Sequence, residues 1–210
     1  LRRVSKPVKE YAKNNPHSMG GWSSDSKSHV AHMEGGDFYG SEKSHVMMNA
    51  DEVQIILESG GETKILKDGL KLLQGEVVDA GVMSTRALRK FLADEISEAN
   101  KQDVLFSLHM KATMMKVSDP IIFGHCVSVF YENVIQKYST ELESIGFDQN
   151  NGIGDLYAKL DHLTEDQQLA IRADIEALYA QQPKLAMVDS DRGITSLHVP
   201  SDVIIDASMP

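Results

Sequence analysis

The stretch STRALRKFLADEISEANKQDVLFSLH (Ser84–His109) places a helical pattern directly before the pattern of a buried strand. In its first part, apolar residues recur at the spacing of an amphipathic helix behind Ser84, a residue type favoured at helix N-caps: Ala87, Leu88, Phe91, Leu92 and Ile96. Its last part, Val104–His109, is short, apolar and bounded by polar residues, as expected of a strand inside a sheet. The stretch therefore predicts a helix of about sixteen residues followed by a strand, a combination typical of α/β folds.

The same alternation continues along the chain. Asp119-Pro120 has the cap and first-turn chemistry of a helix start, and we expect that helix to run to about Gln136. Thr164 and Gln167 have the spacing of a capping box at the start of another helix. Two further apolar runs predict buried strands: Leu185–Val188 and Val203–Ile205. Residues 81–210 are thus predicted to alternate helices and strands, as a mixed sheet with packed helices of the α/β class.

The first 80 residues have a different character. Glycine, serine and histidine are frequent in the first fifty residues, which predicts loops around one brief helix near Val8–Lys13. Glu52–Glu58 (EVQIILE) and Thr63–Lys67 (TKILK) are rich in strand-forming residues, and the Ser-Gly-Gly-Glu between them is a strong hairpin signal. We therefore expect a loop- and strand-rich part (residues 1–80) before the α/β part (81–210), with all 210 residues forming one segment.

Charge and composition exclude several classes of protein. The chain has 31 acidic and 21 basic residues and a formal net charge of −10, which disfavours generic binding to nucleic-acid phosphates. No apolar run reaches the roughly 18 to 20 residues of a membrane span, and the polar, basic start Leu1–Lys9 is unlike a signal peptide. The single cysteine, Cys126, has no partner for an internal disulfide, which favours the cytoplasm.

Both ends of the sequence look like cuts in a longer protein. The chain starts at Leu1 rather than at a methionine, and its last run, Asp202–Pro210, is strand-like and stops without a polar tail. We therefore expect a piece of a longer polypeptide that holds only part of an active site.

Four histidines raise the question of a zinc site. His29 and His32 stand three residues apart, and His17 and His45 lie in the same polar region. The surrounding residues contain neither a cysteine nor an HExxH pattern. Exposed or hydrogen-bonded histidines are therefore the favoured interpretation.

Three other motifs are better explained by structure than by chemistry. His125 and Cys126 are neighbours in a predicted helix and point in different directions, which favours core packing of the thiol over a nucleophile–base pair. Residues 150–155 (NNGIGD) lack the third glycine of a dinucleotide-binding loop and follow a helix, so we expect a turn into a helix at Leu156–Leu160. Asp189–Gly193 (DSDRG) lacks the spacing of a calcium loop and is expected to form a turn.

Two charged residues follow predicted strands, where α/β proteins commonly place functional groups. Lys111 comes just past Val104–His109, and a partly desolvated amine there can transfer protons, although an exposed surface lysine is the commoner case. Asp206 directly follows Val203–Ile205 and suits a Mg²⁺ or Mn²⁺ ligand, with a helix-cap or turn aspartate as an equal alternative.

Five long stretches resemble the monomeric type of NADP-dependent isocitrate dehydrogenase: His17–Met33, Gly35–Ser44, Leu108–His125, Asn150–Lys159 and Leu185–Pro210. The resemblance covers essentially the whole chain, and Met47–Val78 is its most ordinary part. Chains of that family are several times longer, so the resemblance implies an internal segment, similar to the first of two related halves of the family's large domain. The fold it implies is an α/β layer of packed strands and helices.

The resemblance also implies a reaction and residues that take part in it. Isocitrate would be oxidised by hydride transfer to NADP and decarboxylated to 2-oxoglutarate, with Mg²⁺ or Mn²⁺ as the metal cofactor. Lys111 falls on the family's active-site lysine, Asp206 on a metal-binding aspartate, and Arg2 on an arginine that holds a substrate carboxylate, with Arg3 as the neighbouring candidate. Most NADP-binding residues would lie outside this chain.

The partners implied are isocitrate and the missing remainder of the same chain, with neither nucleic acid nor membrane. The alternative is a non-catalytic binding or interaction module derived from the enzyme. The presence of Arg2, Lys111 and Asp206 together favours the enzyme. Alone, the segment is expected to be inactive, and the apolar surface that would meet the rest of its domain favours self-association.

Overall fold

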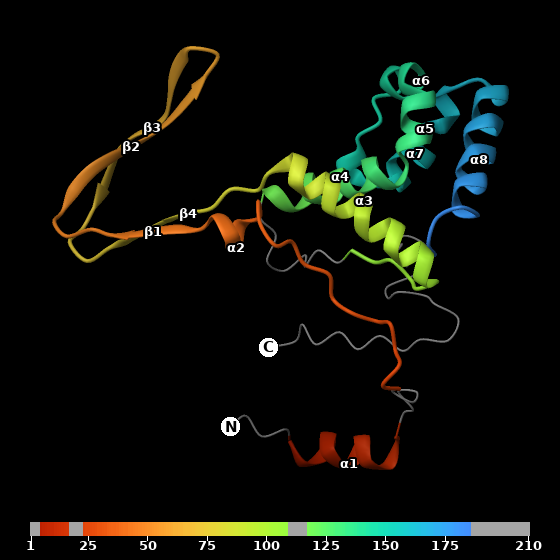
Figure 1. The fold of residues 1–210 in the computed structure, drawn as a ribbon, viewed down its shortest axis with the longest axis horizontal. Helices are drawn as coiled ribbons and strands as arrows, with labels where there is room; N and C mark the ends of the chain where they lie inside the picture. Colours follow the sequence, from red (N-terminus) through yellow and green to blue (C-terminus); the bar gives the residue numbers. More distant parts are fainter. Residues whose placement is uncertain (1–4, 17–22, 109–116, 186–210) are drawn as a thin grey trace.

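The computed structural model describes residues 5–16, 23–108 and 117–185. Along the chain, these residues form a helix, a ribbon of strands and a body of packed helices (Figure 1). Helix α1 (Lys6–Asn14) lies near the N-terminus, a narrow ribbon of strands follows in the chain, and a body of packed helices comes after it. The brief helix predicted near Val8–Lys13 is confirmed, because both residues lie within α1.

The ribbon begins after the short helix α2 (Phe38–Ser41) and consists of two two-stranded antiparallel sheets. The first strand pairs with the last, and the two middle strands pair with each other: β1 (Lys43–Val46), β4 (Val77–Ala80), β2 (Asp51–Ser59) and β3 (Glu62–Leu72). Gly60 and Gly61 join β2 to β3 with φ values of 60° and 81°. A two-residue hairpin turn with positive φ at both positions favours glycine, so the predicted hairpin is confirmed together with its turn.

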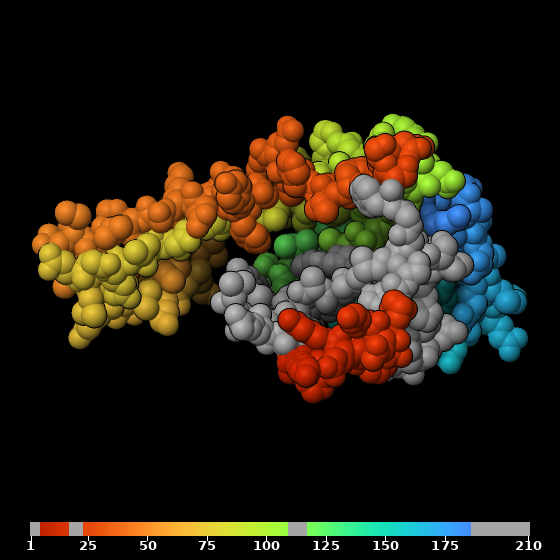
Figure 2. Space-filling model, turned by 90° about the horizontal axis from the view of Figure 1, so that it is seen from below, coloured from red at the N-terminus to blue at the C-terminus, as the bar shows by residue number. Residues whose placement is uncertain are grey.

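The ribbon projects from the helical body as an arm, orange to yellow in Figures 1 and 2. We call residues 43–80 the β-arm. None of the residues in its four strands is buried. The register pairs Val53 with Leu70 and Ile56 with Ile65, and it shifts between Val53 and Ile55 and again between Ile55 and Ile56. Ile55, Ile56 and Ile65 are 49%, 46% and 55% exposed, so apolar side chains of the arm are left uncovered by the described part of the chain.

The body is built from α-helices and short 3₁₀ helices: α3 (Thr85–Gln102), α4 (Ser118–Phe130), α5 (Glu132–Lys137), α6 (Ser139–Ser144), η2 (Gln149–Asn151), α7 (Ile153–Lys159), η3 (Leu160–His162) and α8 (Glu165–Tyr179). Its main core is centred on four fully buried side chains, Leu156, Leu160, Ile171 and Ile175. Two helix starts predicted from sequence are confirmed. Ser84 Oγ accepts a hydrogen bond from Ala87 N (3.3 Å) at the start of α3, and Thr164 and Gln167 complete a capping box at the start of α8.

Helix α4 lies against η2 because it has a glycine at the contact. A Cβ at position 124 would lie 1.9 Å from Asn150 Oδ1 and 3.1 Å from Asn150 Cα. One turn later, Ser128 Oγ lies 2.8 Å from the Gly124 carbonyl oxygen and within hydrogen-bond distance of Gln149 Oε1. This contact sets the path of the chain into α7, where the helix predicted around Leu156 is confirmed.

The strand content of the body differs from the prediction. In the described residues, the run from Val104 pairs only at Phe106, through one parallel bridge to Leu185. Residues 81–185 are therefore mainly helical where they are described, and the sheets found in the described part of the chain are the two of the β-arm. An apolar run indicates burial, but it does not determine whether a strand partner lies beside it. Val203–Ile205 lies outside the described residues.

The helix expected from Asp119 to about Gln136 is also interrupted. Tyr131, with φ −100° and ψ 21°, separates α4 from α5. Its ring is buried and its hydroxyl lies 2.8 Å from the Tyr179 hydroxyl of α8. The fold is thus a mixture of packed helices and small antiparallel sheets. Within the described ranges, no helix combines the length and the apolar character needed to cross a membrane.

Candidate functional site

The three residues predicted for the site, Arg2, Lys111 and Asp206, all lie outside the described residues. The structure does describe residues on either side of Lys111 and residues that precede Asp206 in the sequence. Leu108 and Val117 stand on either side of the Lys111 stretch, and Leu185 is the last described residue before Asp206. The framework of the candidate site is built from these neighbours.

Phe106 and Leu185 form a junction between two of these parts. Phe106 N donates a hydrogen bond to the Lys184 carbonyl oxygen (2.9 Å), and Phe106 pairs with Leu185 in a parallel bridge. Parallel pairing means that both backbones run in the same direction at the junction. The sequence then reaches Lys111 five residues after Phe106 and Asp206 twenty-one residues after Leu185.

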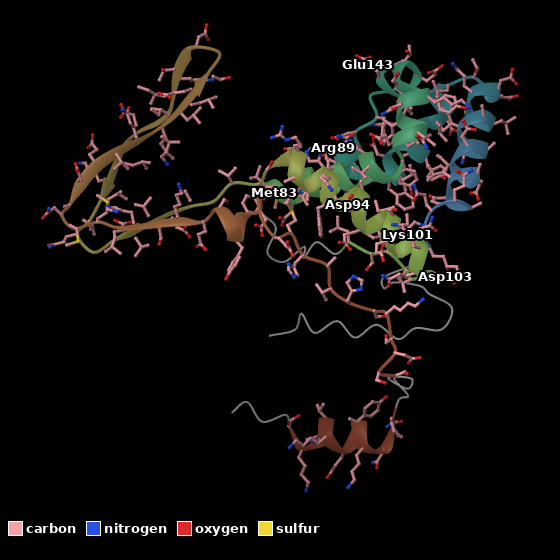
Figure 3. All side chains as sticks on the ribbon, in the orientation of Figure 1. Met83, Arg89, Asp94, Lys101, Asp103 and Glu143 are labelled. Atoms are coloured by element: carbon pink, nitrogen blue, oxygen red, sulfur yellow. The ribbon has the colours of Figure 1, made fainter. Side chains whose placement is uncertain are left out.

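An apolar cluster on α3 and α4 supports the junction, and we call it the anchor cluster. Its buried members are Leu88, Leu92 and Cys126, and the side chains packed against it include Phe106, Leu108, Ile122 and Met83. Met83 lies where the β-arm joins α3 (Figure 3). Leu108 and Ile122 come before and after residues 109–116 in the sequence. Leu108, just before residues 109–116, and Ile122, in the first part of α4, therefore pack against the same cluster.

Cys126 is part of this cluster rather than a reactive group. Burial raises the pKa of its thiol to about 11, so the thiol is protonated at neutral pH. The predicted core-packing role of Cys126 is confirmed.

A polar contact borders the anchor cluster on its α4 side. His125 Nδ1 is buried and has no hydrogen-bond partner among the described residues. Burial, and secondarily the positive charge of Arg89 on α3, lowers the pKa of His125. Arg89, labelled in Figure 3, lies with its Nη2 3.7 Å from Glu132 Oε1 of α5. The neutral imidazole is therefore the favoured form beside Arg89. The sequence analysis considered His125 only as a neighbour of Cys126 and missed this contact between helices.

The residues before the β-arm form a strap along α3, antiparallel to it. Lys27 Nζ donates to the Gln102 carbonyl oxygen (3.1 Å) at the C-terminal end of α3, and the Gly36 carbonyl oxygen accepts from Ser84 N (2.6 Å) before its first turn. Between them, His29 Nε2 lies 3.9 Å from Glu95 Oε2. The strap holds the N-terminal part of the chain against the helix that also carries the anchor cluster. Its residues have neither strand nor helix periodicity, so no sequence pattern predicts this contact.

Two of the histidines that were considered for a zinc site lie in the strap. His29 Nδ1 lies 2.9 Å from the Lys27 carbonyl oxygen, and both His29 and His32 are exposed. In residues 5–16, 23–108 and 117–185, no group of three or more His, Cys, Asp or Glu side chains is placed to hold a metal ion. For His29, the prediction of an exposed, hydrogen-bonded histidine is confirmed. His17 lies outside the described residues.

In the sequence, the residues that lead to Lys111 follow Phe106, and those that lead to Asp206 follow Leu185. Comparison with known proteins identifies the class. The family model for monomeric isocitrate dehydrogenase matches residues 1–210, so the chain belongs to the monomeric isocitrate dehydrogenase family. The predicted resemblance is confirmed over its whole length.

Individual relatives have the same description. The chain is 58% identical over 210 residues to isocitrate dehydrogenase (NADP) 2 of Colwellia maris, and 57% identical over 210 residues to isocitrate dehydrogenase (NADP) of Azotobacter vinelandii. It is 48% identical to isocitrate dehydrogenase (NADP) 2 of Mycobacterium tuberculosis. Each match covers 100% of this chain and 28% of the relative, so the chain spans less than a third of the length of these proteins.

Proposed function

We propose that this chain forms part of an NADP-dependent isocitrate dehydrogenase, which oxidises isocitrate and decarboxylates the product to 2-oxoglutarate and carbon dioxide. The observation that carries the proposal is the match of all 210 residues to the family, at 58% and 57% identity to two relatives named as NADP isocitrate dehydrogenases. Within that enzyme we assign the segment to the first half of the large domain. The lone, buried Cys126 thiol suits the cytoplasm as its compartment.

Lys111 handles the proton of the substrate hydroxyl. A neutral lysine amine accepts that proton while hydride passes from the same carbon to NADP, and the ammonium ion can return a proton to the enolate left by loss of carbon dioxide. Leu108 and Ile122 pack against one apolar cluster, which supports this assignment, because a group that transfers protons must be held in a fixed position.

Arg2 and Asp206 complete this chain's share of the site. Arg2 binds a carboxylate of isocitrate through a paired, charge-assisted contact, with Arg3 as the alternative. Asp206 is one ligand of a Mg²⁺ or Mn²⁺ ion, which when bound supplies charge stabilisation at the oxygen of the reacting carbon. No group of three or more His, Cys, Asp or Glu side chains in the described part of the chain is placed to hold a metal ion, so the remaining ligands come from other residues of the protein or from the substrate.

The remainder of the longer protein is the partner that this segment needs. The chain spans 28% of the length of its relatives, and the apolar side chains Ile55, Ile56 and Ile65 of the β-arm are uncovered in the described structure. Residues of the longer protein outside these 210 residues cover them, because a two-stranded ribbon is at best marginally stable by itself.

A chimera tests the proposal. In Azotobacter vinelandii isocitrate dehydrogenase (NADP), the stretch that matches this chain is replaced by residues 1–210, and NADPH formation is measured with isocitrate and Mn²⁺. We expect turnover within about tenfold of the parent enzyme and none from the 210 residues alone, since most of the proximity that accelerates the reaction is then lost. Lys111→Met in the chimera should lower turnover by roughly 10² to 10⁴. A folded chimera without activity would instead favour a non-catalytic module.

A further inference from the structure

We propose that Asp68, together with Gly69, forms a modification site on the β-arm, where the aspartate rearranges to isoaspartate without an enzyme. The product is a substrate for the class of methyltransferase that transfers a methyl group from S-adenosylmethionine to isoaspartyl carboxylates. The inference rests on described residues of β3 and is independent of the proposed reaction with isocitrate.

Asp68 and Gly69 lie at an irregularity in the pairing of β2 with β3. The register shifts between Val53 and Ile55 of β2. Asp68 and Gly69 of β3 therefore stand opposite the single residue Gln54, as in a β-bulge, and Gly69 has the positive φ (65°) for which such bulges favour glycine. Both residues are exposed on a ribbon that projects from the helical body, so water and other proteins reach them in the described structure (Figures 1 and 2).

The side chain of Asp68 is folded back onto the amide that follows it. Gly69 N lies 2.9 Å from Asp68 Oδ1, so this nitrogen and the carboxyl carbon, which would be joined in a succinimide ring, are already close together. Gly69 has no Cβ to hinder the approach, and an ideal Cβ at this position would have nothing within 4 Å. The contact and the open space together favour ring closure.

The rearrangement needs no reagent other than water. Gly69 N attacks Cγ of the protonated Asp68 carboxyl group, so the N–Cγ bond forms, the Cγ–OH bond breaks, and the hydroxyl group leaves as water with the amide proton. Water then opens the succinimide at one of its two carbonyl carbons. Opening at the backbone carbonyl of Asp68 breaks its bond to Gly69 N, so the chain continues through Cγ as isoaspartate.

The product differs from aspartate in its backbone and in its free carboxylate. The former side chain adds a carbon atom to the backbone, at a point where the pairing of β2 with β3 is already irregular. The former backbone carbonyl becomes a carboxylate. An isoaspartyl methyltransferase esterifies this group: a carboxylate oxygen takes the methyl group and S-adenosylhomocysteine is released.

Asp51 of β2 is an internal control, because it has the same contact without the glycine. Glu52 N lies 2.8 Å from Asp51 Oδ1, and Asp51 is exposed on the same arm. Glu52 has a side chain that hinders the approach, and it is paired with Lys71 in the strand register. We therefore expect Asp68 to rearrange much faster than Asp51.

Asn151 is the opposite control, because it has the glycine without the freedom of the amide. An asparagine before glycine forms the same ring with loss of ammonia. Gly152 is buried, however, and its N–H donates a hydrogen bond to the Gln149 carbonyl oxygen (3.0 Å). The fold of the helical body should therefore protect Asn151, whereas the β-arm leaves Asp68 unprotected.

The experiment incubates the 210-residue chain at neutral pH for several weeks. Isoaspartate is located by peptide mapping and counted with isoaspartyl methyltransferase and radiolabelled S-adenosylmethionine. We expect Asp68 to rearrange at least as fast in the chain as in the free peptide Glu62–Leu72, and at least about tenfold faster than Asp51. Asn151 should react at least about a hundredfold more slowly in the chain than in a free peptide of residues 147–155, which also shows that the body is folded. A slower reaction of Asp68 in the chain than in its peptide, or equal rates at Asp68 and Asp51, would overturn the inference.

Two substitutions at the site sharpen the test. Asp68→Glu keeps the negative charge but requires a larger ring, so methyl incorporation should fall to the background level, whereas the matched control Asp51→Glu should leave it unchanged. Asp68→Asn should react faster than aspartate and release ammonia, because an amide is attacked more readily than an ionised carboxylate. Unchanged methyl incorporation in Asp68→Glu would place the modified residue elsewhere and overturn the inference.

Discussion

The β-arm and the helical body contain similar apolar side chains, which are buried in the body and exposed in the arm. Ile175 in α8 is 0% exposed, whereas Ile65 in β3 is 55% exposed. The body finds its own packing partners, because α4, α5, α7 and α8 contribute side chains to one core. The strands of the arm bury nothing in the described structure, although the register pairs Val53 with Leu70 and Ile56 with Ile65. The body therefore buries its apolar side chains within the described part of the chain, whereas the apolar side chains of the arm are covered by nothing there.

The same substitution in the two regions should give the largest contrast. In the 210-residue chain, Ile175→Ala should lower the free energy of unfolding by about 2 to 5 kcal/mol, because it opens a cavity in a closed core. Ile65→Ala should change the free energy of unfolding by about 0.5 kcal/mol or less, since the Ile65 side chain is already exposed to solvent. Urea unfolding followed by circular dichroism measures both. Equal losses at the two positions would show that the arm has a core of its own.

Close packing inside the body can be tested with two glycines. Gly124→Ala would place a Cβ 1.9 Å from Asn150 Oδ1, so η2 must move away from α4. We expect a loss of about 1 to 3 kcal/mol in unfolding free energy. Gly154→Ala is the matched control: a Cβ in that part of α7 has nothing within 4 Å, and it should stabilise the chain by up to about 1 kcal/mol. A gain in unfolding free energy at both positions would show that helix propensity, rather than close packing at Gly124, decides the effect.

The capping box of α8 should contribute a smaller amount. Thr164→Ala removes the side-chain oxygen that accepts from Gln167 N and should lower the unfolding free energy by about 1 kcal/mol. Thr164→Ser keeps that oxygen and should lose much less. If alanine and serine at this position have the same unfolding free energy, the cap does not stabilise the body.

The smallest effect concerns the pH dependence of the α3–α4 contact. The pKa of His125 is lowered in the folded chain from 6.5, so the unfolded state binds the proton more readily. The free energy of unfolding should therefore fall as the pH drops below 6.5, and level off below the folded pKa. His125→Gln should make this slope shallower between pH 7 and 5 in urea titrations. An identical slope in the variant would assign the pH dependence to other groups.

Local signals in the sequence identified most of the helices. Ser84, Thr164 and the spacing of Leu88, Leu92 and Ile96 predict helix starts and buried faces from residues that lie close together in the chain. The Gly60-Gly61 turn is predicted for the same reason. The break at Tyr131 was missed, since no glycine or proline marks it in the sequence.

The candidate site was predictable only in part, and for the same physical reason. The apolar runs that begin at Val104 and Leu185 were predicted as strands, but the pairing of Phe106 with Leu185 at a single bridge joins parts that are distant in the sequence. The strap along α3 was missed, because its contacts come from backbone carbonyls and from the polar residues Lys27 and His29. Lys111 and Asp206 were singled out because each follows a predicted strand, whereas Arg2 came from the family resemblance alone. The specific roles of all three come from the resemblance and stay predictions.

Hydrogen exchange of the β-arm tests the central claim of this comparison most directly. Amide exchange is measured by mass spectrometry in the 210-residue chain and in the chimeric enzyme. We predict that α4, α7 and α8 are protected in both proteins, whereas the amides of β2 and β3 exchange within seconds in the chain alone and at least a hundredfold more slowly in the chimera. An arm that is equally protected in the isolated chain, or one that stays unprotected in the chimera, would contradict the claim that the rest of the enzyme covers it.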